Sequence, residues 1–197
     1  MTADQPLGVF DSGIGGLTVA RAIRELLPQE SILYLGDTAR VPYGNKSSET
    51  VIRYAQEDAA FLKREGVKMI IVACNTASAF ALEALQSDLE IPVIGVIEPG
   101  VEAALAQSNS KHIGIIGTSG TISSGAYQNQ IAARQSEMRV SSKATPLLVP
   151  LIEEGWLDHS VTAKVLDEYL QPMLNEEVDT LVLACTDNTN VFGIALG

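Results

Sequence analysis

The sequence predicts an α/β fold with largely parallel sheets. Short apolar runs alternate with amphipathic stretches of helix length along most of the chain, which is the pattern of β-α-β units. Met69–Ala73 is apolar at every position, as expected for a strand buried on both faces of a parallel sheet. The alternation begins again after Ile97. We therefore expect two similar α/β domains, residues 1–97 and 98–197.

In the first half, two helices have clear boundary signals. Pro28 ends the first of them, and Gly66 ends the second, which has Ser47 or Ser48 as its N-cap. The expected helices are Gly16–Leu27, Ser47–Arg64 and Ser78–Leu89. The expected strands are Leu7–Phe10, Ile32–Leu35, Met69–Ala73 and Pro92–Ile97.

In the second half, one expected strand contains a proline. Because Pro146 cannot donate to a ladder of hydrogen bonds, it places the run Ala144–Val149 at the edge of a sheet or in a bent segment. The other expected strands are Ile113–Ile116 and Thr180–Ala184. The expected helices are Glu98–Gln107, Ile122–Arg134 and Ser160–Leu174.

Charge and hydropathy exclude several classes of protein. The net charge of −11 and the pI of about 4.5 argue against a general nucleic-acid binder, which needs a basic face. No apolar run approaches the roughly 20 residues that cross a bilayer. The segment Met1–Pro6 is short and polar, without the apolar centre of a signal peptide. We expect a soluble cytoplasmic protein with no membrane or nucleic-acid partner.

The chain has two cysteines, and both follow predicted strands. Cys74 comes after the third strand and Cys185 after the last, whereas Asp11 follows the first. Ligands of open α/β sheets bind at the carboxyl ends of the strands. Free cysteines are often simply buried apolar residues, and a disulfide is not expected in a reducing cytoplasm. Their shared position at strand ends favours a functional role over the buried one.

Each cysteine leads into residues that suit a carboxylate ligand. Asn75, Thr76 and Ser78 lie at a predicted helix start, where N–H groups and the helix dipole favour anions and lower a thiol pKa. The run Gly117–Thr121 is either a second anion-binding turn or an ordinary strand-to-helix turn. The run DSGIGG lacks the third glycine of a dinucleotide fingerprint, because position 18 is Thr18.

Seven segments in order resemble the glutamate racemases of the cofactor-independent aspartate/glutamate racemase family. They are GVFDSGIGGLTV, YLGDTARVPYGNKS, IIVACNTASA, PVIGVIEPG, IGIIGTSGTISSGAY, LLVPLIEEGW and LVLACT, and they span about Leu7 to Thr186. The resemblance implies two α/β domains of similar topology with the active site in the cleft between them. It implies interconversion of L- and D-glutamate without metal or other cofactor, which supplies D-glutamate for peptidoglycan, and a homodimer as in many family members.

The resemblance also implies roles for residues of this chain. The implied catalytic residues are Cys74, Cys185, Asp11 and Glu153. The implied substrate contacts are Asp11, Ser12, Pro42, Tyr43, Gly44, Cys74, Asn75, Thr76, Thr118, Thr121, Cys185 and Thr186. Asp37 lies in one of the matching segments without a defined role.

Two thiols suit racemisation for a physical reason. The α-proton must leave one face of the substrate and a proton must reach the other face. A single base tends to return the proton to the same side. One thiolate that abstracts and one thiol that donates solve this geometry, provided that neighbouring groups tune each pKa.

The chain departs from the family after Thr186. The family has a histidine there, whereas this chain has Asp187, whose charge raises the pKa of a nearby thiol. The family also continues with further elements, so we expect both domains to be incomplete, as in a truncated or frame-altered product. His112 and His159 are expected at the surface or beside a strand, and with the cysteines they fit no zinc spacing. The alternatives are a catalytically impaired relative that binds an acidic amino acid or a protein partner, and an aspartate racemase.

Overall fold

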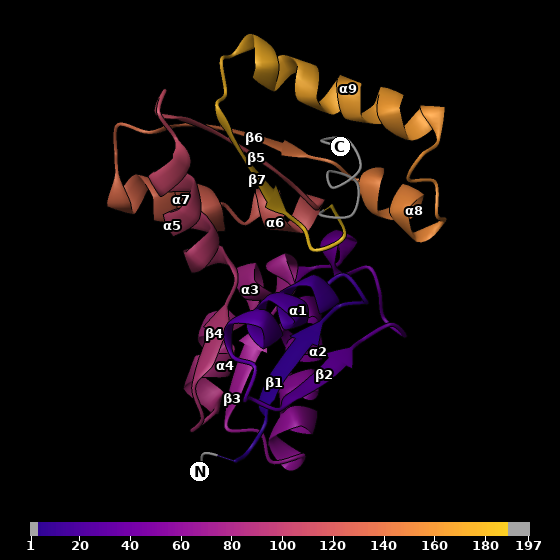
Figure 1. Cartoon of the computed structure of the whole chain (residues 1–197), viewed down its shortest axis with the longest axis vertical. Coiled ribbons are helices and arrows are strands. Elements are labelled where there is room, and N and C mark those ends of the chain that lie inside the picture. The colour runs from indigo at the N-terminus through magenta and orange to yellow at the C-terminus, as the bar shows by residue number, and fades with distance from the viewer. Residues whose placement is uncertain (1–3, 189–197) are drawn as a thin grey trace. The chain divides into compact units, whose positions relative to one another are not determined.

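The computed structural model describes residues 4–188 and divides the chain into two compact α/β units (Figure 1). The first unit ends at Val96 and the second begins at Ile97. Each unit has one parallel sheet with helices packed on both of its faces. The α/β class and the parallel sheets predicted from the sequence are confirmed.

The first unit contains a four-stranded sheet in the order β2-β1-β3-β4, and every pair is parallel. Its strands are β1 (Leu7–Asp11), β2 (Ile32–Gly36), β3 (Met69–Val72) and β4 (Val93–Gly95). Its helices are α1 (Leu17–Leu26), α2 (Ser48–Arg64), α3 (Asn75–Phe80) and α4 (Leu82–Asp88), with a short 3₁₀ helix η1 (Tyr43–Asn45) before α2. Phe10 pairs with Val72, so the carboxyl ends of β1 and β3 meet at one edge of the sheet.

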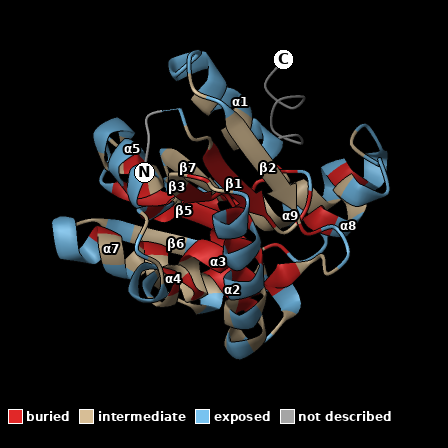
Figure 2. Ribbon diagram, turned by 90° about the horizontal axis from the view of Figure 1, so that it is seen from below, coloured by how far each residue is buried: buried red, intermediate tan, exposed pale blue. Residues whose placement is uncertain are grey.

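The two faces of strand β1 bury alternate side chains against different helices. Leu7 and Val9 pack with Val19 and Ile23 of α1 on one face. Phe10 belongs to the core on the other face, where α2, α3 and α4 pack. This period of two is the sheet geometry expected from the sequence. Buried positions of this sheet therefore concentrate in the central strands β1 and β3, and the outer faces of the helices are exposed (Figure 2).

The second unit contains a three-stranded parallel sheet in the order β6-β5-β7. Its strands are β5 (His112–Gly117), β6 (Arg139–Ala144) and β7 (Thr180–Ala184). Its helices are α5 (Ile97–Gln107), α6 (Ser119–Ser123), α7 (Ala126–Arg134), α8 (Leu148–Glu153) and α9 (Ser160–Asn175). Helices α8 and α9 pack on one face of the sheet around Ile116, Leu148 and Met173.

One strand prediction in the second unit is wrong. The run Ala144–Val149 is not a strand: β6 lies before it, and its end begins helix α8. Pro150 sits in the first turn of α8, where a missing N–H costs the helix nothing. Strand β6 was missed because its sequence, RVSSKA, is polar and has no buried position, as an edge strand allows.

Three smaller predictions need correction. The predicted helix Ser78–Leu89 starts earlier and is two helices, α3 and α4. The predicted helix Ile122–Arg134 is also divided, because Gly125 adopts a left-handed conformation with φ of 69° before α7. His112 is buried rather than at the surface, and its ring nitrogens bond the Glu176 carbonyl and the Ser141 hydroxyl, both at 2.8 Å.

Among residues 4–188, no helix combines the length and the apolar character needed to cross a bilayer.

Candidate functional site

The turn after strand β1 holds a buried carboxylate. Asp11 is 1% exposed, and its Oδ2 accepts hydrogen bonds from the N–H groups of Gly13 at 3.0 Å and Gly16 at 3.1 Å. Gly16 lies so close that a Cβ there would be 2.5 Å from the Cβ of Asp11. Only glycine fits at this contact. The DSGIGG turn is therefore shaped around Asp11, and no dinucleotide function is needed to explain its glycines.

Cys74 caps helix α3 at the neighbouring strand end. Its Sγ accepts the N–H of Ala77 at 3.5 Å, and the Sγ lies 3.6 Å from the hydroxyl oxygen of Ser12, to which the thiol donates. Burial and then the charge of Asp11 raise the pKa of Cys74 to about 12, whereas hydrogen bonds that Ala77 and Ser12 can donate to the thiolate lower it. The sequence predicted a pKa lowered by the helix start. In the structure, burial and a like charge outweigh that short helix.

The polar residues after Cys74 serve different purposes. Asn75 and Thr76 are buried in the first turn of α3. The Ser78 hydroxyl donates to the carbonyl of Val72 at 2.9 Å and accepts the N–H of Val96 at 3.3 Å. Ser78 therefore fastens α3 to the ends of β3 and β4 and does not act as a carboxylate ligand.

The segment that contains Pro42, Tyr43 and Gly44 lies between β2 and α2. Tyr43 and Gly44 are buried in η1, and the Tyr43 hydroxyl donates within a cluster that contains Asp37 and Asp58. Sequence reasoning did not find Asp58. The sequence does contain one indication of its role: Asp58 occupies a position on the face of α2 that is buried and otherwise apolar.

Cys185 directly follows strand β7 and is buried. The Cys185 Sγ lies 3.8 Å from Oδ2 of Asp187, to which the thiol donates. Thr186 is also buried, and neither polar atom of the Asn188 amide has a hydrogen-bond partner among residues 4–188. Asp187, which stands where the resemblance implies a histidine, therefore bonds the second thiol.

The other predicted residues of the second unit lie on α6 and α8. Thr118 caps α6 by accepting the N–H of Thr121 at 3.2 Å, and the two hydroxyls are 3.0 Å apart. Both follow β5, and Gly117 of β5 pairs with Ala184 of β7, so Thr118 and Cys185 share one sheet edge. Glu153 is the last residue of α8 and is exposed.

The structure thus groups the predicted residues by strand end within each unit. In the first unit, Asp11, Ser12, Cys74, Asn75 and Thr76 gather at the carboxyl ends of β1 and β3. In the second unit, the carboxyl ends of β5 and β7 hold Thr118, Thr121, Cys185 and Thr186. Pro42–Gly44 follow β2 in the first unit, and Glu153 lies on α8. Each sheet therefore carries one cysteine at the edge where α/β proteins bind ligands.

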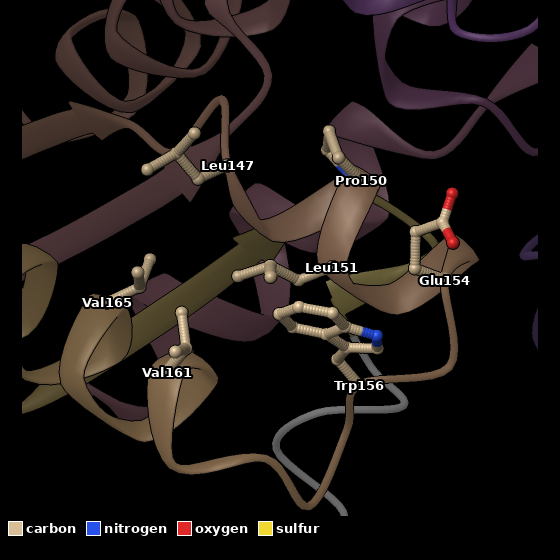
Figure 3. Close-up of a pocket in the computed structure, with 7 residues that line it drawn as sticks. All are labelled: Leu147, Pro150, Leu151, Glu154, Trp156, Val161 and Val165. Carbon is tan, nitrogen blue, oxygen red and sulfur yellow. The ribbon is translucent and has the colours of Figure 1, made fainter.

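A separate apolar groove of about 260 Å³ lies between α8 and α9 (Figure 3). Leu147, Pro150, Leu151, Glu154, Trp156, Val161 and Val165 line it. No predicted site residue is among them, and Glu154 is the only lining residue with a charged side chain. Apart from Glu154, the residues that line the groove have no group suited to moving a proton.

Comparison with known proteins decides the family. The family model described as Asp/Glu/Hydantoin racemase matches residues 17–192. The chain belongs to this family. A glutamate racemase from Aquifex aeolicus is 54% identical over 180 residues, which are 91% of this chain and 70% of that relative. A glutamate racemase from Geobacter metallireducens is 55% identical over 180 residues, which are 91% of this chain and 67% of the relative.

Solved structures of the family match both units. A glutamate racemase isoform from Bacillus anthracis has a TM-score of 0.93 and 42% identity, covering 98% of this chain and 72% of that one. The Francisella tularensis glutamate racemase in complex with D-glutamate has a TM-score of 0.90 and 41% identity, covering 96% of this chain and 72% of that one. These likenesses confirm the two-domain α/β architecture of the racemases and the racemase character of the chain.

Proposed function

We propose that this chain is a cofactor-independent glutamate racemase that uses Cys74 and Cys185 as its two acid–base groups. The observation that carries the proposal is the placement of one buried cysteine at the carboxyl edge of each sheet. The relatives above 50% identity that bear the name glutamate racemase support the choice of substrate.

In the proposed reaction, the thiolate of one cysteine takes the α-proton from glutamate and becomes a thiol. The electron pair of the C–H bond remains on the substrate as a carbanion delocalised into the α-carboxylate. The thiol of the other cysteine then gives its proton to the opposite face and becomes a thiolate. The raised pKa of Cys74 keeps that residue protonated at neutral pH, so Cys74 is available as the donor. The two cysteines exchange roles when the reaction runs in the opposite direction.

The substrate must be held while charge develops on its carboxylate. We assign that role to Asn75 and Thr76 on α3 and to Thr118, Thr121 and Thr186 in the second unit. Ser12 and the segment Pro42–Gly44 complete the proposed contacts. Asp11 and Glu153 are the acidic residues proposed to serve Cys74 and Cys185 respectively.

The wider setting follows from the family. We propose that the enzyme works in the cytoplasm as a homodimer and supplies D-glutamate for peptidoglycan. Residues 1–97 and 98–197 are its two proposed domains. Light scattering coupled to size-exclusion chromatography measures the mass, and a monomer at micromolar concentration would contradict the dimer.

A second candidate function rests on Asp187. The Cys185 thiol donates to this carboxylate at 3.8 Å, where family members have a histidine. A carboxylate beside a thiol disfavours the thiolate that must act as the base. The second candidate is therefore a relative that binds an acidic amino acid without racemising it.

One experiment separates the two candidates. Purified protein is incubated with L- or D-glutamate, and with both aspartates, and the enantiomers are separated by chiral chromatography. Racemisation drives either glutamate to a 1:1 mixture, because enantiomers have equal free energies. Calorimetric binding of glutamate without conversion would instead establish the binding relative, and faster conversion of aspartate would change the substrate.

Three variants extend this test. Cys74→Ala and Cys185→Ala are each expected to lower kcat by at least about a thousandfold, since the reaction needs both proton carriers. Asp187→His restores the family residue and is expected to raise kcat. Racemisation by either alanine variant at the wild-type rate would exclude the two-thiol mechanism.

A further inference from the structure

The hydroxyl of Tyr43 is enclosed by two carboxylates inside the first unit. Tyr43 is 1% exposed, and its Oη lies 2.9 Å from Oδ2 of Asp58 and in shorter contact with Oδ2 of Asp37. A phenol has one hydrogen, so it donates to one of the carboxylates at a time. Contacts with the two carboxylates therefore hold the hydroxyl in place, and its one hydrogen is not available to a ligand.

A single guanidinium ties the two carboxylates together. Arg40 reaches Oδ2 of Asp37 from its Nε at 2.6 Å and Oδ1 of Asp58 from Nη2 at 2.8 Å. Its Nη1 pairs with Glu57, and the guanidinium carbon lies 4.3 Å from the centre of the Tyr54 ring. The rigid planar fork of arginine suits such a cluster, in which several acceptors must be held at fixed angles.

The cluster joins a loop to a rigid helix. Asp37 and Arg40 lie in the connection that leads from β2 to η1, whereas Asp58 is buried within α2. Helix α2 has 17 residues and packs on the sheet through Val51, Ala55 and Leu62. The position of the loop is therefore set by contacts with a long helix that packs on the sheet.

The anchored loop lies beside the first cysteine. Helix η1 contacts α3, the helix that Cys74 caps. Because the Tyr43 ring is buried and its hydroxyl is engaged, the main chain of Pro42–Gly44 is the part of this loop that can meet a substrate. The geometry of the contact between this main chain and a substrate then depends on how firmly Tyr43 is held.

We propose that Asp58 and Arg40 are positioning residues that act through the Tyr43 hydroxyl to hold the main chain of Pro42–Gly44 against the substrate. This inference rests on the proposed racemase function. Neither side chain touches the substrate in this account, and their effect is on the geometry of the binding loop.

The electrostatics of the cluster support this role. The groups that face Asp58 are Tyr43, Asp37, Arg40 and Glu57. Burial is the main cause that raises the pKa of Asp58 to about 6, against the lowering effects of the Tyr43 hydrogen bond and Arg40. Three carboxylates around one guanidinium leave the cluster short of positive charge, so it holds together best with one extra proton.

The test compares steady-state kinetics of four variants with those of the wild type. Asp58→Ala and Tyr43→Phe each remove the bond between helix and loop, and each is expected to raise the KM for L- and D-glutamate about tenfold while kcat falls less than about threefold. Asp58→Asn keeps an acceptor for the phenol and is expected to stay within about threefold of the wild-type KM. Glu49→Gln, on the exposed first turn of α2, is the matched control and is expected to change neither constant.

Further measurements distinguish a positioning role of Asp58 from a folding defect and from a failure of the proposed racemase function. The double variant of Asp58→Ala and Tyr43→Phe should raise KM no more than one change alone, because both break one linkage. Calorimetric dissociation constants for glutamate give the same comparison without turnover. An unchanged KM and dissociation constant in folded Asp58→Ala and Tyr43→Phe would overturn the inference while leaving the racemase intact. An inactive wild type would refute the proposed function instead.

Discussion

Replacement of Gly16 by alanine tests how the first half of the site is built. An ideal Cβ at this position would lie 2.5 Å from Cβ of Asp11, 2.9 Å from its Cγ and 3.0 Å from the Tyr34 hydroxyl oxygen. The Asp11 carboxylate cannot simply turn aside, because its Oδ2 holds the N–H groups of Gly13 and Gly16. Gly16→Ala must therefore displace the aspartate beside Cys74.

The expected loss of folding stability in Gly16→Ala follows from the steric clash of the new Cβ and from the hydrogen bonds to Asp11 that the clash disturbs. Inserting a methyl group into a packed site costs typically about 1–3 kcal/mol, and each lost hydrogen bond adds about 0.5–1.5 kcal/mol. The backbone of Gly16, with φ of −65° and ψ of −9°, suits alanine. Because alanine lowers the conformational entropy of the unfolded chain, the substitution also stabilises the folded state by about 0.4–1 kcal/mol. We expect a net loss of about 1–3 kcal/mol in the free energy of unfolding.

Gly13→Ala is the matched control. Gly13 donates to the same carboxylate oxygen, but a Cβ there would meet only Cγ2 of Val41 at an ordinary 3.5 Å. Urea unfolding followed by circular dichroism compares the two variants, and kcat for glutamate reports on the site. Gly16→Ala should lower both quantities and Gly13→Ala neither. Equal stability and activity of the two variants would refute the claim that the turn is shaped around Asp11.

Two further predictions concern titration. The pKa of Asp58 rises from 3.8 to about 6 on folding, so its stabilising effect is complete below about pH 4 and is lost as pH rises through 6. The unfolding free energy of wild type relative to Asp58→Asn should therefore fall by about 2.5 kcal/mol between pH 4 and 7, and a flat difference would contradict the burial argument. With a pKa of about 12, Cys74 should be alkylated by iodoacetamide at pH 8 roughly a thousandfold more slowly than a free thiol. In Cys185→Ala the rate should rise about tenfold per pH unit to pH 10, and a plateau below pH 9 would contradict the raised pKa.

Most of the fold could be predicted because its strands are apolar and its helices have clear boundaries. Met69–Val72 reads as a buried strand, and Ser47 and Gly66 mark the ends of α2. Strand β6 and helix α8 could not be separated in this way. The edge strand has polar side chains on both faces, and the apolar run LVPLIE is compatible with either a strand or a short helix.

The sequence also located the strand-end residues, because the topology of parallel sheets places them at one edge. It could not give the environment of each group. A helix start after Cys74 indicates a lowered thiol pKa, yet the burial of the sulfur and the contact with Asp11 depend on tertiary packing. Asp58 illustrates the same limit, since its partner Tyr43 is 15 positions away and its partner Arg40 is 18.

The most direct test of the two-thiol account is the fate of the α-hydrogen in D₂O. Purified protein is given L-glutamate or D-glutamate, and each enantiomer is analysed for α-deuterium during the first turnovers. The account predicts that the enantiomer formed carries deuterium from the start, whereas the remaining substrate stays protiated. Deuterium that enters the starting enantiomer as fast as product forms would show a single base acting on one face and would contradict the central claim.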